Sequence, residues 1–172
     1  MAHKSLRRLV AALIVLGTMA VSGRAYAAPY QDGLVAYEQG QFIDAIREFR
    51  SLAVTGHPGA EFMLGVMHFN GFGVDRNEKV AAIYFRLAAE QGDAGAQLAF
   101  GSLHVRGIGV MQNLVEARKW LSICSRSATP ELARQATALI SATASLMTAA
   151  EISRADRDAE RWRPVRAGLV RP

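Results

Sequence analysis

The chain has 172 residues, which is enough for one domain of ordinary size but leaves no room for two. Hydrophobic residues make up 51% of it and charged residues 20%, a balance that excludes an intrinsically disordered chain and indicates a packed core. The single cysteine, Cys124, excludes an intrachain disulfide framework and a zinc site built from several cysteines. Alanine is abundant while glycine and proline are modest, which favours helices.

The net charge of +5 is concentrated at the N-terminus. The first 27 residues contain no acidic residue and four basic ones, Lys4, Arg7, Arg8 and Arg24. The other 16 basic residues face 15 acidic ones, so the rest of the chain carries a formal charge of only +1. A nearly neutral body argues against a phosphate-binding surface, and no nucleic-acid partner is expected.

The chain begins with the pattern of an export signal. Residues 1–8 are basic, residues 9–21 are apolar, and a small-x-small sequence follows at Ala25 and Ala27. These are the three regions of a secretory signal peptide, and they predict cleavage after Ala27, so that the mature chain starts at Ala28. The apolar run of 13 residues is shorter than the roughly 20 that span a bilayer. An uncleaved membrane anchor is the alternative interpretation.

The leader also predicts where the protein is found. No cysteine follows the apolar run, which excludes lipid attachment at that point. An alanine-rich chain with such a leader is typical of exported bacterial proteins. We therefore expect a periplasmic or secreted protein, with no stable membrane insertion once residues 1–27 are removed.

The rest of the chain repeats itself with a period of 36 residues. Residues 41–76 and 77–112 share twelve identities in 36 positions without a gap, including a Gly-x-Gly-Val tetrapeptide at 71–74 and again at 107–110. A third copy over residues 113–147 keeps the start of the pattern but has lost the tetrapeptide. A period in this range indicates a repeat architecture, in which each unit packs on its neighbours.

Each copy has the pattern of two helices. In the second copy Ala81, Phe85 and Ala89 recur at helical spacing, which predicts a helix with one buried face. Gly92 is placed to end this helix and Asp93 to cap the next one. A pair of short helices cannot bury both of its faces, so the pattern predicts an all-α solenoid of stacked α-hairpins.

Two further helices are expected beside the two full copies. One lies near residues 32–38, before the first copy. The other begins at Thr129-Pro130, where the threonine is a candidate cap and the proline suits the first helical position. With a closing helix, the total is about seven helices.

The closing helix is expected over residues 148–163. Thr148 and Glu151 form a capping-box pattern at its start. Its apolar side, which includes Trp162, is predicted to pack onto the preceding helix and to seal the end of the core. Residues 164–172 are expected to be a flexible tail.

The two full copies share a set of fixed positions. In the second copy these are Ala81, Tyr84-Phe85, Ala88-Ala89, Gly92-Asp93, Ala96, Gly101 and Gly107-Ile108-Gly109-Val110, and in the first Ala45, Phe49, Gly56-His57, Ala60, Leu64-Gly65 and Gly71-Phe72-Gly73-Val74. This pattern resembles the Sel-one-like repeat (SLR) family, a branch of the tetratricopeptide-like (TPR-like) helical repeats.

The resemblance covers residues 30–163. It implies a right-handed solenoid domain over residues 28–163, of the kind found in small exported bacterial members. Family members serve as scaffolds and adaptors for many partners, so the resemblance is specific for fold and weak for function. His68 and His104 depart from the family pattern, because they occupy its usual tyrosine position.

The tetrapeptide glycines are expected to have a structural role. Gly71, Gly73, Gly107 and Gly109 would shape the turns that lead from one repeat into the next. The tetrapeptide is not a dinucleotide-binding fingerprint, because it follows a helix rather than a strand and lacks a third glycine. No cofactor is therefore expected.

Three other residues invite a chemical role. His68 and His104 lie one repeat apart, which raises the hypothesis of a shared metal ion, but partly buried histidines that pack against the loops are the favoured interpretation. Cys124 lies among apolar residues, so a buried core thiol is favoured over a nucleophile. We assign no catalytic residue and no metal ligand.

Arg50 and Arg86 recur at one position of the first helices. Two interpretations stay open for them. They line one face of the solenoid and meet an acidic partner, or they are an ordinary pair of solvated arginines.

The function expected from the sequence is a non-enzymatic, monomeric protein-interaction module of the bacterial periplasm. It would bind a protein or peptide segment in the concave face of the solenoid. The alternative is a cell-envelope accessory factor that recognises polysaccharide or the peptidoglycan machinery. An enzyme is the remaining alternative, and it would need a deep pocket with perturbed acidic groups, which no sequence feature requires.

Overall fold

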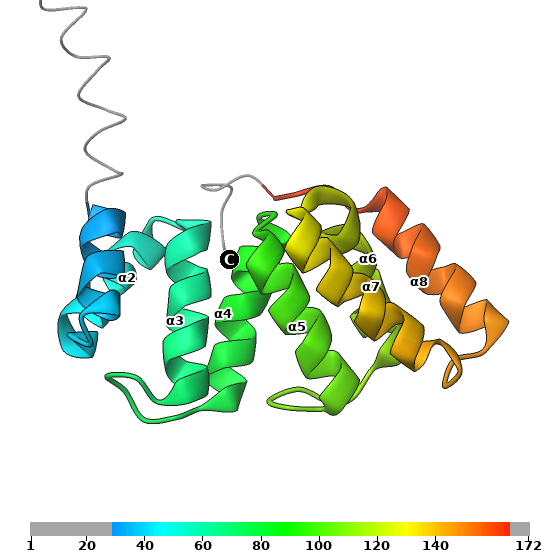
Figure 1. The fold of residues 1–172 in the computed structure, drawn as a ribbon, viewed down its shortest axis with the longest axis horizontal. Coiled ribbons are helices and arrows are strands. Elements are labelled where there is room, and N and C mark those ends of the chain that lie inside the picture. The colour runs from blue at the N-terminus through cyan, green and yellow to red at the C-terminus, as the bar shows by residue number, and fades with distance from the viewer. Residues whose placement is uncertain (1–28, 166–172) are drawn as a thin grey trace, which may run out of the picture.

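The computed structural model describes residues 29–165 (Figure 1). Every regular element among them is a helix, which confirms the all-α repeat solenoid predicted from the sequence. These residues form eight helical segments, one more than expected: residues 29–38, α2 (Phe42–Val54), α3 (Pro58–Asn70), α4 (Glu78–Glu90), α5 (Ala94–Arg106), α6 (Leu114–Ser127), α7 (Pro130–Ala144) and α8 (Ala149–Arg161). In this part of the chain, no helix has both the length and the apolar character needed to cross a membrane.

Some of the sequence predictions fall on residues that the structure does not describe. These are the signal peptide over residues 1–27, the mature N-terminus at Ala28, and residues 166–172 of the expected tail.

Side-chain caps set the starts of most helices. The Asp93 carboxylate accepts a hydrogen bond from the Ala96 N–H at 2.7 Å, so the predicted cap of α5 is confirmed. Asn77 and Asn113 cap α4 and α6 in the same way. The Thr129 side chain makes no cap bond, which corrects that prediction. α7 begins there without it because the proline at its first position already has a helical φ.

Glycines allow the repeats to pack closely. A Cβ placed on Gly65 of α3 would lie 2.6 Å from the Phe85 ring of α4, and one on Gly101 of α5 would lie 2.9 Å from the Leu121 side chain of α6. The second helix of each unit therefore lies directly against the first helix of the next. This is the main contact between successive repeats. Because it recurs every 36 residues, the repeat in the sequence becomes a regular stacking of α-hairpins in the structure.

The loops after α3 and α5 turn on left-handed glycines. Gly71 and Gly107 end the two helices with φ of 78° and 69°. Gly73 and Gly109 follow with φ of 70° and 69°. A Cβ on Gly73 would lie 2.8 Å from the carbonyl oxygen of Phe42, so the loop touches the start of its own first helix. This contact leaves no space for a side chain at that position.

The closing helix α8 does not lie where the sequence predicted. It starts with the expected capping box, in which the Glu151 N–H donates to Thr148 Oγ1 and the Thr148 N–H donates to the Glu151 carboxylate. It ends at Arg161, with Trp162 already in extended backbone. The prediction that it packs onto the preceding helix, α7, is wrong, because α8 packs mainly against α6.

Candidate functional site

α8 is held along α6 by one ion pair and two small residues. The Arg118 guanidinium of α6 makes paired hydrogen bonds of 2.9 and 3.0 Å to the Asp156 carboxylate of α8. Arg126 donates a hydrogen bond of 2.7 Å to the carbonyl oxygen of Ala159. Ala155 and Ala159 are at most 1% exposed, and their short side chains let the two helices approach closely. The solenoid therefore binds a helix of its own chain through a carboxylate and small apolar side chains.

The segment after α8 extends this contact toward α4. The Trp162 ring meets the Trp120 ring of α6 edge-on, with the centroids 6.0 Å apart and the planes at 70°. The Val165 N–H donates a hydrogen bond of 2.8 Å to the carbonyl oxygen of Glu90, at the end of α4. The C-terminal segment thus covers one side of α6 and reaches the end of α4.

The 36-residue period locates the equivalent surface on α4 and α2. Trp120 and Ile123 of α6 lie under α8 and the segment that follows it. One repeat earlier these positions are Tyr84 and Leu87 of α4, and two repeats earlier the second of them is Ser51 of α2. Neither α2 nor α4 packs extensively against α8. We call this surface the open face, and define it by Arg50, Ser51 and Val54 of α2 with Tyr84 and Leu87 of α4.

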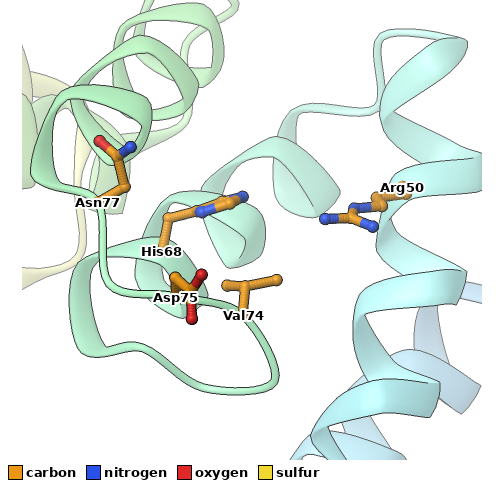
Figure 2. Close-up of a pocket in the computed structure, with 5 residues that line it drawn as sticks. All are labelled: Arg50, His68, Val74, Asp75 and Asn77. Atoms are coloured by element: carbon orange, nitrogen blue, oxygen red, sulfur yellow. The ribbon is translucent and has the colours of Figure 1, made fainter.

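A pocket of about 490 Å³ lies at the edge of the open face. Its lining comes from three elements, as Figure 2 shows: Arg50 from α2, His68 from α3, and Val74, Asp75 and Asn77 from the loop before α4. The Arg50 side chain points across the pocket toward His68 (Figure 2). The pocket therefore places a cation, an imidazole and a carboxylate around an open space.

The two repeated arginines lie in different surroundings. Arg86 is 4.0 Å from the Glu90 carboxylate, which follows it by one helical turn. The residue one turn after Arg50 is Val54, which is 87% exposed. Within the described residues Arg50 forms no ion pair and no hydrogen bond, and of the two arginines it alone lines the pocket. The structure therefore makes Arg50 the more available of the two cations.

The two repeated histidines do not share a site. The His68 ring stacks on Tyr84, with the centroids 5.7 Å apart and the planes at 14°, while the His104 ring meets Phe100 edge-on at 4.7 Å. His104 Nδ1 lies 3.2 Å from the carbonyl oxygen of Met111. Within residues 29–165, no three His, Cys, Asp or Glu side chains come together in a way that would hold a metal ion. Each histidine instead packs on an aromatic ring of its own neighbourhood.

Both histidines have perturbed titration. Burial lowers the pKa of His68, the nearby Arg50 cation lowers it further, and the backbone of Asp75 partly opposes the shift. Burial also lowers the pKa of His104, against the effect of the Met111 backbone. Both side chains are therefore held neutral in the folded protein over a wider pH range than in the unfolded chain.

We expect the free energy of unfolding to fall as the pH decreases from about 7.5 to about 5.5. The unfolded histidines titrate near pH 6.5 and the folded ones at lower pH, so the unfolded chain binds more protons below that value. The stabilisation is complete above the unfolded pKa and is lost as the pH falls through it toward the folded pKa. Urea midpoints at the two pH values should differ less in a His68→Gln/His104→Gln variant. An equal fall in both proteins would contradict this assignment.

Cys124 is a buried thiol, as expected. It is 0% exposed, and its Sγ lies 3.4 Å from the carbonyl oxygen of Ala94. Burial raises the pKa of the Cys124 thiol, and the Asp93 charge raises it further. The reactive thiolate is therefore disfavoured.

Sequence reasoning missed several residues of this site. Asn77 and Asn113 recur at the 36-residue offset directly before α4 and α6, and that recurrence is a signal for repeated caps. Asp75 carried no signal, because its repeat equivalent is a methionine. The pair of Arg118 with Asp156 also carried none, since the two residues are 38 positions apart and α8 lies outside the repeat pattern.

The Sel1 repeat family model matches residues 58–93 and 94–123. The first match spans 36 residues, the same length as the period, but begins at α3 rather than at α2. No curated protein matches the sequence significantly.

Two solved structures have the same architecture. One is c5321, a protective antigen present in uropathogenic Escherichia coli strains that displays an SLR fold; it is 28% identical with a TM-score of 0.72, and the match covers 80% of this chain and 29% of c5321. The other is a Sel1 repeat protein from Oxalobacter formigenes, 24% identical with a TM-score of 0.61 over 77% of this chain and 53% of that one. This chain therefore spans only part of the length of either protein. With its 36-residue period, its left-handed glycine loops and both matches, the chain carries two Sel1 repeats in a repeat fold of the Sel1-like (SLR) type.

Proposed function

We propose that this protein is an exported, non-enzymatic interaction module that binds a helical segment of a protein partner on its open face. Sel1 repeat proteins are generally protein-interaction modules, and they are typically scaffolds without catalytic activity. Beyond that general role, we propose which surface binds (the open face), what it binds (a helical segment) and where the protein acts (outside the cytoplasm).

The observation that carries the proposal is the docking of α8 on α6. In this solenoid a first helix of a repeat already binds an amphipathic helix, through buried alanines and an arginine–carboxylate pair. Among the helices of residues 29–165, none lies over the equivalent positions on α4 and α2 as α8 lies over α6. The repeats present the same backbone positions at equivalent points, so the open face is suited to a second helix beside α2 and α4. Arg118 itself has no counterpart there, because Ala82 and Ile46 occupy its positions.

The proposed location is supported by the leader. Residues 1–27 have the three regions of a secretory signal peptide, and the predicted mature chain starts at Ala28. A periplasmic or secreted partner is the consequence. Binding in the concave face, which the sequence led us to expect, stays a prediction. In this proposal the partner binds on the open face.

Photocrosslinking in the producing cells tests this proposal. A photoreactive amino acid at Ser51, which is exposed on α2, should capture a protein partner, whereas the same group at Ala138, exposed on α7, should not. Both sites are solvent-accessible, so the comparison separates a specific surface from general stickiness. Mass spectrometry of the captured species should find it in the envelope fraction, with this protein starting at Ala28.

Two results would contradict the proposal. Equal capture from Ser51 and Ala138, or none from either, would remove the open face as a docking surface. A full-length, cytoplasmic protein would remove the export part while leaving the interaction part standing.

A further inference from the structure

Arg50 indicates which kind of helix the open face recognises. We propose that the partner helix presents an acidic residue to Arg50, with a small apolar residue one turn away that covers Val54. The inference rests on the proposed function and adds the chemistry of the ligand. Three observations carry it: the way α8 is bound, the surroundings of Arg50, and the contrast with Arg86.

The bound helix α8 shows the chemistry that this solenoid accepts. Asp156 pairs with Arg118 through two hydrogen bonds, and Ala159, one turn later, is 1% exposed against α6. The recognised unit is therefore a carboxylate and a small apolar side chain on the same helical face, three residues apart. A partner with this unit would bury an apolar contact and complete an ion pair in one step.

The open face presents the complementary pair on α2. Arg50 and Val54 are one turn apart, the first an unpaired cation within the described residues and the second an apolar side chain that is 87% exposed. The neighbouring Arg47 is already occupied, since it lies 3.0 Å from the Asp44 carboxylate and also contacts Glu48. An incoming carboxylate therefore has one preferred cation on this helix, and that cation is Arg50.

The other charged groups near Arg50 are compatible with this ligand. His68 faces Arg50 across the pocket, and its lowered pKa keeps it neutral near pH 7. Asp75 lines the pocket without forming an ion pair with Arg50. Asp75 is therefore placed to accept a hydrogen bond from a donor on the same partner.

The second repeat provides an internal comparison. Arg86 occupies the same position as Arg50, but Glu90 follows it by one turn and supplies the carboxylate from within the chain. At the position of Glu90 the first repeat has Val54. The chain thus places a carboxylate within 4.0 Å of Arg86, whereas Arg50 has no carboxylate one turn away. The matched substitutions Arg50→Ala and Arg86→Ala separate these two cases.

A peptide that copies residues 148–163 of this chain is the probe. It carries the acidic and small apolar residues of α8, and in the full protein the α6 site is occupied by α8 itself. We expect the labelled peptide to bind the mature protein weakly, with affinity that falls as salt is raised. Arg50→Ala in the protein should weaken binding about three- to fivefold, while Arg86→Ala should leave it unchanged. Val54→Glu should weaken it similarly, because it gives Arg50 an internal partner.

A double-mutant cycle makes the test specific. Asp156→Asn in the peptide should weaken binding to the wild-type protein by the same factor and should cause no further loss against Arg50→Ala. Coupling of the peptide residue to Arg118 instead would show that the peptide replaces α8 on α6. That result, or additive losses at Arg50, or no binding at about 1 mM peptide, would overturn the inference.

The proposed function and the acidic-helix inference can be tested independently of each other. If Ser51 crosslinks a cellular partner and Arg50→Ala leaves the crosslinking unchanged, the open face binds a partner but does not recognise an acidic helix. A crosslinked product of two copies of this chain would identify the occupant as α8 of a second copy, and would overturn the assignment to a different protein.

Discussion

Replacing Gly109 with alanine is expected to destabilise the folded protein by about 3 kcal/mol. Gly109 has φ of 69°, a conformation that costs an L-residue about 1–2 kcal/mol. The added Cβ would also overlap the carbonyl group of Glu78, at the start of α4. Because that carbonyl belongs to helix backbone, it cannot move aside as the end of a flexible side chain would. Chemical denaturation of the two proteins measures the loss.

Gly40→Ala is the matched control for this prediction. Gly40 has φ of 73°, almost the same conformation, but a Cβ there would have no atom within 4 Å. It should therefore cost only the conformational part, about 1 kcal/mol. The difference between the two variants isolates the contact of the loop with α4. If both variants lose the same free energy of unfolding, the close approach of position 109 to the Glu78 carbonyl does not exclude a side chain there.

Removing α8 is expected to have the second large effect. A chain that ends at Met147 loses the covering of Trp120 and the partners of Arg118, and should lose at least about 3 kcal/mol of unfolding free energy. Burial of large apolar side chains contributes about 1.5–3 kcal/mol each, and the truncation removes Trp162 and exposes the side of Trp120 that it contacts. Thermal unfolding and light scattering should show a lower midpoint and self-association.

A chain that ends at Val165 is the control for the truncation. It keeps α8, the Trp162 contact and the hydrogen bond of Val165 to Glu90, and should unfold at nearly the wild-type midpoint. A chain ending at Met147 that stays monomeric and equally stable would show that α8 is not part of the folded unit.

The difference between Arg50 and Arg86 shows how much of a binding site a repeat pattern can predict. The 36-residue offset alone put Arg50 and Arg86 at the same position, but it treated them as equals. The difference arises one turn later, where the first repeat has Val54 and the second has Glu90. It could have been predicted from the helical spacing, whereas the pocket that Arg50 forms with His68 required the loop to be folded.

The sequence by itself determined most of what depends on local chemistry or on the repeat, with the absent Thr129 cap as the exception. Asp93 and the Thr148–Glu151 pair cap their helices because a cap needs only residues three positions apart. Recurring alanine and glycine positions determined the stacked α-hairpins, since every unit packs on a copy of itself. Only the tertiary structure decided where α8 lies. No repeated unit follows it, so its position depends on a pair as distant in sequence as Arg118 and Asp156, and neither periodicity nor helix propensity contains that contact.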